Sequence, residues 1–223
     1  MNDSKEQWLS VYSQMDSFDI RLGKVHAQVY IHDPKALTFV LSRYKFVAKM
    51  LDGKNKVLEV GCGDGFGVPV VSQHVGQILC TDIYEVTLED NRQRLSLFEN
   101  IDFQYHDFRE KPLGESVDAV YMVDVLEHIY PEEEKTFLDN VVASITDVGV
   151  AIIGTPNKKA EEFASPYSRL GHVNLKDHRS LRKIAERYFH SVFMFGMNDE
   201  VVHTGFAPMA HYLWVLCSHP RKD

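Results

Sequence analysis

The feature that most constrains the fold is a short apolar run that leads directly into a glycine-rich segment, residues 57–67, with the sequence VLEVGCGDGFG. Every second residue from Gly61 to Gly67 is a glycine. Glycine permits positive φ angles in a tight turn and lets the backbone approach a ligand closely. We therefore expect a buried first strand followed by a ligand-binding loop, because α/β folds bind ligands beyond the carboxyl ends of their strands.

The chain after this loop alternates short apolar stretches with helical segments, a pattern typical of a parallel sheet with helices on both faces. Five candidate strands lie at residues 57–60, 78–82, 101–107, 117–123 and 148–154. Two more, at residues 192–195 and 212–216, have no helix between them and are expected to pair antiparallel. The expected fold is an α/β, Rossmann-like, mostly parallel seven-stranded sheet with an antiparallel last strand.

Three helices can be placed from their start signals and their apolar spacing. Asp33 and Pro34 predict a helix start, and apolar residues in 37–51 repeat at helical spacing. Pro131 opens a second helix, with glutamates in its first turn, and Asp177 is expected to cap a third.

Length and charge limit the domain organisation and the partners. A chain of 223 residues suits one domain with a sizeable core. We divide it into an N-terminal cap and helix, residues 1–50, and a ligand-binding domain, residues 51–223. The formal net charge of -8 argues against a nucleic-acid partner, because phosphate binding needs a basic surface.

Cysteine usage and the lack of long apolar stretches indicate a cellular compartment. The three cysteines, Cys62, Cys80 and Cys217, show no metal-ligand spacing and are an odd number, which favours reduced thiols over disulfides. The N-terminus lacks an export signal, and no stretch reaches the roughly 18 apolar residues of a membrane span. We therefore expect a cytoplasmic protein without a membrane partner, as a monomer or homodimer.

A carboxylate and the glycine spacing together indicate the kind of ligand. Asp82 ends the second strand about 20 residues beyond the loop, where a carboxylate can accept both ribose hydroxyls. A dinucleotide fingerprint needs glycine at its sixth position, yet the sixth residue counted from Gly61 is Phe66. The spacing therefore disfavours NAD.

An acidic residue, any residue and then alternating glycines, here beginning at Glu59, resembles motif I of class I S-adenosylmethionine-dependent methyltransferases. The resemblance covers most of residues 51–154. Leu126-Glu127-His128 resembles the corresponding segment of ubiquinone-biosynthesis-type and related small-molecule methyltransferases, and residues 154–157 (GTPN) are similar to that subgroup as well. The resemblance implies that residues 51–223 bind S-adenosylmethionine.

The resemblance also implies where the cofactor lies. In this family the position of Glu59 belongs to the methionine end of the site, while Asp107 and the backbone amide of Phe108 match the position that reads the adenine edge. The expected cofactor-binding residues are Glu59, Gly61, Cys62, Gly63, Asp82, Ile83, Asp107, Phe108 and Val123. Asp82 or Asp107 alone could instead be a helix N-cap, because aspartate favours that position.

Histidines are the natural candidates to accept a proton from a hydroxyl acceptor. His128 lies just past the fourth strand, where the acceptor would meet the methyl group, so we expect it to be the catalytic residue. Tyr44, His172 and His203 are expected to contact the substrate, although core packing accounts for Tyr44 equally well. No metal site is expected.

These features predict methyl transfer to a small polar metabolite, most naturally on oxygen. The alternatives are an N-methyltransferase, a non-catalytic S-adenosylmethionine-binding subunit and, with least support, an NAD-dependent oxidoreductase. Nucleic-acid methylation is disfavoured because Asp124-Val125-Leu126-Glu127 stands where an Asn-Pro-Pro-Tyr-like motif would be.

Overall fold

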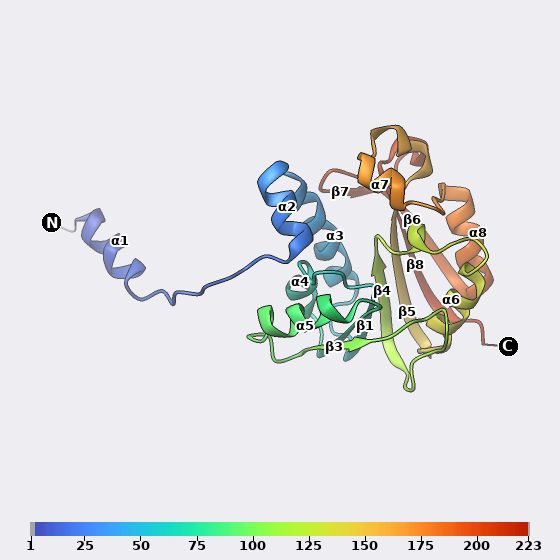
Figure 1. Cartoon of the computed structure of the whole chain (residues 1–223), viewed down its shortest axis with the longest axis horizontal. Coiled ribbons are helices and arrows are strands. Elements are labelled where there is room, and N and C mark those ends of the chain that lie inside the picture. Colours follow the sequence, from blue (N-terminus) through green and yellow to red (C-terminus); the bar gives the residue numbers. More distant parts are fainter. Residues whose placement is uncertain (1–2, 223) are drawn as a thin grey trace.

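The structure is a computed structural model that describes residues 3–222, and within these residues eight strands form one mixed sheet (Figure 1). The strands are β1 (Lys56–Val60), β2 (Gln77–Asp82), β3 (Ile101–Tyr105), β4 (Val117–Val123), β5 (Ile145–Pro156), β6 (Phe189–Asn198), β7 (Val201–His203) and β8 (Tyr212–Pro220). Their order across the sheet is β3-β2-β1-β4-β5-β8-β6-β7. Strands β1 to β5 run parallel, and β8 lies antiparallel between β5 and β6.

Helices cover both faces of the sheet. They are α1 (Ser4–Tyr12), α2 (Lys24–His32), α3 (Ala36–Met50), α4 (Val68–Ser72), α5 (Glu85–Arg94), α6 (Glu134–Ala143), α7 (Pro166–Gly171) and α8 (His178–Tyr188), with short 3-10 helices η1 (Leu126–His128), η2 (Lys158–Phe163) and η3 (Ala207–Met209). None of the described helices is long and apolar enough to span a membrane.

The two hydrophobic cores follow from the alternation of strand side chains between faces. Val57 packs on one face with Val47 of α3 and with α4 and α5. The next residue, Leu58, packs on the other face with Leu138 of α6 and with α8. Because both faces are covered, the central strands are apolar on both sides, which explains why they read as continuous apolar runs.

The seven predicted strands are confirmed, and the structure adds an eighth. β6 and β8 pair antiparallel as expected, from Phe189 opposite Pro220 to Met197 opposite Tyr212. The additional strand, β7, pairs only three residues with the end of β6. A segment this short has no measurable period, so the sequence gives no signal for it.

Two of the helix starts predicted from capping residues can be compared with the structure. Asp177 caps α8 as expected, because its carboxylate accepts a hydrogen bond of 2.8 Å from the backbone N–H of Ser180. The helix expected from Asp33 instead begins at Ala36. Asp33 is the C-cap residue of α2, where its N–H bonds back to the carbonyl of Val29, while its own carbonyl accepts from the N–H of Ala36 and so links the two helices.

The N-terminal residues form two helices that the sequence did not predict. Helix α2 lies beside α3, whereas α1 extends away from the sheet on the segment 13–23 (Figure 1). Side chains of α1 such as Trp8 and Tyr12 are exposed. The parts of residues 3–32 that touch the rest of the molecule therefore include α2 and Arg21, which pairs with Asp90 of α5.

Candidate active site

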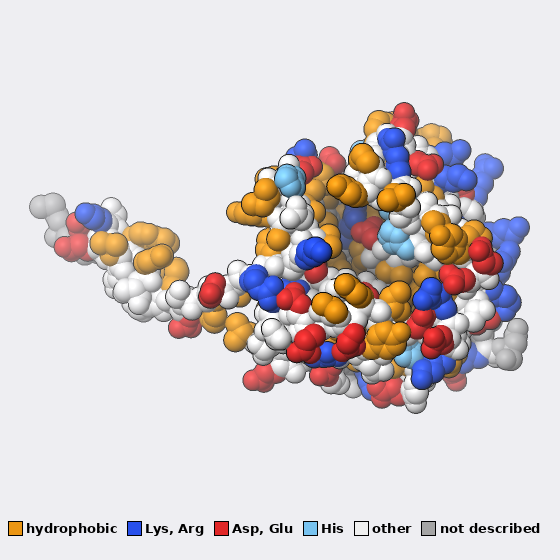
Figure 2. All heavy atoms as spheres, viewed as in Figure 1, with side chains coloured by type: hydrophobic (Ala, Val, Ile, Leu, Met, Phe, Trp, Pro, Cys, Tyr) orange, Lys and Arg blue, Asp and Glu red, His pale blue; other side chains and the backbone are white. Residues whose placement is uncertain are grey.

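A cavity of about 350 Å³ lies at the carboxyl ends of β1, β2 and β4. The predicted site residues that line it are Gly61, Gly63, Asp82, Ile83, Asp107, Phe108 and His128. Figure 2 shows that the face bearing this end of the sheet is hollowed between α2 and α7, with histidine side chains at the hollow. The structure therefore brings most of the predicted cofactor residues and the predicted catalytic histidine to one cavity.

The glycine loop has a backbone that only glycine adopts readily. Gly61 and Gly63 have φ angles of +71° and +52°. A Cβ atom on Gly61 would lie 2.6 Å from the side chain of Val125, so this turn lies directly against the loop after β4. On Gly63 a Cβ atom would meet no atom within 4 Å, which leaves room for a ligand beside the backbone.

Asp82 fixes the loop from the neighbouring strand. Its Oδ2 accepts a hydrogen bond of 2.9 Å from the backbone N–H of Gly63, and its Oδ1 accepts one of 3.0 Å from that of Tyr84. Tyr84 is the N-cap residue of α5, so Asp82 also stabilises the turn that starts this helix. Each carboxylate oxygen retains a lone pair for a further donor.

Asp107 forms an ion pair that sequence analysis missed. The guanidinium of Arg109 donates to both carboxylate oxygens, with Nη2 at 2.6 Å from Oδ2 and Nε at 3.0 Å from Oδ1. These hydrogen bonds from Arg109 hold the pKa of Asp107 below its ordinary value. Arg109 also lines the cavity. No pattern in the sequence indicates that this side chain folds back on a residue two positions earlier.

Glu59 lies behind the cavity wall and is fully buried. The hydroxyls of Tyr44 and Tyr121 each donate to its carboxylate at 2.9 Å, and the thiol of Cys80 lies 3.6 Å from Oε2. Burial raises the pKa of Glu59 to about 7. Glu59 thus joins α3, β1, β2 and β4 beneath the glycine loop, and Tyr44 faces this carboxylate. Cys62 is buried in the same core, as is Val123.

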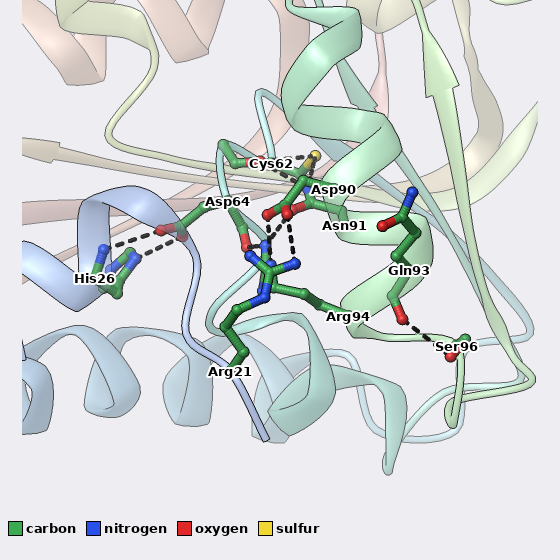
Figure 3. A network of polar contacts seen from close by, with 10 residues as sticks. Arg21, His26, Cys62, Asp64, Asp90, Asn91, Gln93, Arg94 and Ser96 are labelled. Atoms are coloured by element: carbon green, nitrogen blue, oxygen red, sulfur yellow. Dashed lines mark hydrogen bonds and ion pairs between the residues drawn. The ribbon is translucent and has the colours of Figure 1, made fainter. Parts of the chain in front are cut away.

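The N-terminal cap holds the glycine loop from outside (Figure 3). Asp64 accepts hydrogen bonds from the backbone N–H of His26 at 2.9 Å and from its ring Nδ1 at 2.6 Å. Burial raises the pKa of Asp64, but the hydrogen bonds from His26 outweigh it and leave the pKa below its ordinary value. From α5, Asn91 donates to the carbonyl of Gly63 and Arg94 to that of Asp64. The loop is therefore clamped between α2 and α5.

At the end of β4, Asp124 has a φ angle of +57°, a left-handed conformation that is strained for a residue with a side chain. Arg43 of α3 donates to its Oδ2 at 2.5 Å. The guanidinium of Arg43 also lies 4.0 Å from the ring centre of Tyr212. Asp124 lines the cavity as well, so strain and charge meet where the loop after β4 lies beside the glycine loop.

Glu127 follows in η1 and is fully buried. The hydroxyl of Thr155 donates to its Oε2 at 3.0 Å, and the backbone N–H groups of Val173 and Asn174 donate to its carbonyl. Burial, and next the charge of Asp124, raise the pKa of Glu127. Glu127 therefore ties β5 and the segment after α7 to the loop that follows β4.

The structure brings His128 and His172 together and places His203 elsewhere. His128 Nδ1 lies 2.8 Å from the carbonyl of Gly171, and the two histidine rings are 5.2 Å apart. Burial, and next His128, lower the pKa of His172. His203 lies on β7, where Nε2 bonds to Asn198 and Nδ1 accepts from the N–H of Gly205. His203 is not among the residues that line the cavity.

Comparison with known proteins indicates which family this chain resembles. Residues 57–149 match the family described as "Methyltransferase domain". A probable S-adenosylmethionine-dependent methyltransferase of Mycolicibacterium smegmatis is 28% identical over 116 residues, which are 52% of this chain and 43% of that protein. These similarities support a class I S-adenosylmethionine-dependent methyltransferase. The matched part spans less than half the length of this relative.

Solved structures share the fold of this methyltransferase over nearly the whole chain. A DhpI structure in complex with S-adenosylhomocysteine has a TM-score of 0.66 and 16% identity, and the match covers 97% of both chains. The N-methyltransferase NodS of Bradyrhizobium japonicum, also with S-adenosylhomocysteine, has a TM-score of 0.62 and 16% identity over 98% of this chain and 100% of that one. At these identities the likeness establishes the fold.

The cofactor of the methyltransferase is S-adenosylmethionine, and the cavity fits it. The open space beside Gly63 is a cradle that any side chain would fill, and it adjoins the free lone pairs of Asp82. A cofactor without phosphates needs no basic cradle, and the loop between Gly61 and Gly67 contains no lysine or arginine.

We predict that Asp82→Ala weakens the binding of S-adenosylhomocysteine by about 1.5–3 kcal/mol, roughly 10- to 150-fold in Kd, because it removes a charged acceptor at the cavity. Isothermal titration calorimetry measures this, with Asp102→Ala at the amino end of β3 as the matched control. Equal affinities for the two variants would show that Asp82 acts only as a turn cap.

We predict that Glu59→Gln changes how stability depends on pH. The pKa of Glu59 is about 7 in the folded protein and near 4.5 in the unfolded chain. The stability that the protonated Glu59 side chain contributes to the folded protein is therefore fully present below pH 4.5 and is lost as the pH rises through 7. This corresponds to at most about 3 kcal/mol. Urea unfolding between pH 5 and pH 8 should show the stability of the variant rising relative to the wild type. A constant difference would contradict the raised pKa.

Proposed function

We propose that this methyltransferase transfers the methyl group of S-adenosylmethionine to an oxygen atom of a small polar metabolite. The observation that carries the proposal is the shared cavity. His128 and Asp124 line the same cavity as Gly61, Gly63 and Asp82. A group able to take a proton therefore faces the space next to the glycine loop, which supports an enzyme over a subunit that only binds the cofactor.

Individual residues of the cavity have proposed roles toward the cofactor. Asp82 would accept hydrogen bonds from the ribose hydroxyls, as carboxylates at this position of α/β folds do. Asp107 and the backbone amide of Phe108 would contact the adenine edge, with Arg109 keeping the carboxylate ionised. Gly61 and Gly63 would lie beside the methionine part.

When bound, S-adenosylmethionine supplies an electrophilic methyl group on a positively charged sulfur. The protein has to hold the acceptor in line with that group and exclude water. His128 is suited to receive or orient a hydroxyl proton. Its Nδ1 donates to the carbonyl of Gly171, a group that can only accept, so Nε2 carries the free lone pair. Such proton transfer typically contributes about 10²–10⁴-fold to a rate.

The second candidate is methyl transfer to an amine. Asp124 lines the same cavity as His128, and a carboxylate there would attract a protonated amine. An amine must lose its proton before it can attack a methyl group, and Nε2 of His128 could accept that proton as well. The identity of the acceptor distinguishes the two candidates.

We also propose that the protein works in the cytoplasm. Cys62, Cys80 and Cys217 are buried and carry free thiols. Buried thiols without disulfides suit a reducing compartment.

Incubation with radiolabelled S-adenosylmethionine and a pooled metabolite extract tests the proposed function. A labelled small molecule that yields a methyl ether on analysis is the expected result. A labelled methylamine would favour the second candidate. Absence of any labelled product, with S-adenosylhomocysteine still bound, would contradict both.

We predict that His128→Ala lowers turnover of the identified acceptor by about 10²–10⁴-fold and leaves the affinity for S-adenosylhomocysteine unchanged. His190→Ala is the matched control, because His190 is exposed on β6. Steady-state kinetics and calorimetry on both variants give the two readouts. Normal turnover in a folded His128→Ala protein would reduce His128 to a structural residue.

A further inference from the structure

Three side chains that can donate lone pairs converge at the acceptor end of the cavity. Glu127 and His128 come from η1, and His172 is the residue that ends α7. One ligand atom from each lies within 4.8 Å of the other two. We propose that Glu127, His128 and His172 bind a divalent transition-metal ion beside the place where the acceptor meets the methyl group.

Glu127 provides an independent indication of a ligand. Its side chain is fully buried, yet Oε1 has no hydrogen-bond partner among the described residues. Leaving a buried carboxylate oxygen unpaired is costly, so such atoms generally have a function or a bound partner. Thr155 occupies the other oxygen, Oε2, and thereby fixes the orientation of the carboxylate.

The hydrogen bond that orients the ring of His128 is of the kind commonly made by metal-binding histidines. Its Nδ1 donates to the carbonyl of Gly171 at 2.8 Å, which leaves the lone pair on Nε2. Histidines that bind metals commonly donate their other ring N–H to a backbone carbonyl or carboxylate, because this fixes the ring and its tautomer. His172 is half-buried, and its ring centre lies 5.2 Å from that of His128.

Asp124 adds negative charge next to the three ligands. Its Oδ1 is shielded from solvent and has no hydrogen-bond partner among the described residues, whereas Oδ2 binds Arg43. Asp124 lies three residues before Glu127 and lines the same cavity as His128. Arg43 offsets part of this charge through its contact with Oδ2.

The ligand set indicates the class of ion and its use. Two imidazoles with one carboxylate suit zinc and other divalent transition metals, and such sites keep a position open for substrate. His128 and Asp124 line the cavity, so that position would face the acceptor. This inference rests on the proposed function and deepens it: the acceptor would bind the ion through a hydroxyl, whose pKa the ion lowers so that its proton passes to water, and Nε2 of His128 would then hold the ion instead of accepting that proton.

The sequence analysis expected no metal site, and the reason is the distance along the chain. His172 lies far from the Glu127-His128 pair in sequence. Contacts of Gly171 with His128, and of Val173 and Asn174 with the carbonyl of Glu127, bring it close. No local spacing signals such a ligand set.

Calorimetric titration of tag-free, EDTA-treated protein with ZnCl₂ and with MnCl₂ tests the site, with MgCl₂ for comparison. We expect one Zn²⁺ or Mn²⁺ per chain in the wild type and in the control His190→Ala. His172→Gln should lower the affinity at least roughly tenfold, and Glu127→Gln provides a second variant. Bound S-adenosylhomocysteine shows that each variant is folded.

Equal metal affinity in wild type and both ligand variants, or no saturable binding, would overturn the site. Methyl transfer that is unchanged after EDTA treatment would also overturn it, while leaving the proposed function intact. One bound ion that is lost in His172→Gln, together with no methyl transfer to any acceptor, would support the site and contradict the proposed function.

Discussion

The buried carboxylate of Glu59 is the constraint on which the rest of the site depends. A charge or acid group with no exposure must be hydrogen-bonded, and Tyr44 and Tyr121 supply those bonds from α3 and β4. Their geometry sets α3 against the sheet directly beneath the glycine loop. Arg43, the neighbour of Tyr44 on the same helix, then reaches Asp124 at the end of β4. One helix thus aligns both walls of the cavity.

The two walls differ in how well their polar groups are satisfied. On the cofactor side, Asp82 and Asp107 are hydrogen-bonded to backbone amides or to an arginine, so this wall is preformed. At the acceptor side, Asp124 adopts a strained backbone conformation, and buried oxygens of Asp124 and Glu127 have no hydrogen-bond partner among the described residues. Strain and unpaired polar atoms reduce stability and persist where they serve a ligand. We infer that the acceptor proposed to bind on this side of the cavity supplies partners for these polar atoms.

Local signals made the sheet and the loop predictable, because strand periodicity and the glycines are read within a few residues. The same is true of the cap at Asp177. Contacts between distant residues were not predictable: Arg43 and Asp124 are 81 positions apart, and nothing near either one indicates the pairing. Tyr44 was expected at the substrate or in the core, and only the fold shows that it faces Glu59. The closeness of His172 to His128 likewise depends on the path of the segment that connects β5 to α8, which local sequence does not indicate.

Calorimetry with S-adenosylhomocysteine and with NAD tests most directly whether the glycine loop holds a cofactor of the methyltransferase type. The glycine spacing and the single carboxylate at Asp82 predict saturable binding of S-adenosylhomocysteine and much weaker binding of NAD or none. Tighter binding of NAD than of S-adenosylhomocysteine would contradict the assignment of the cavity and, with it, the functions proposed for the residues that line it.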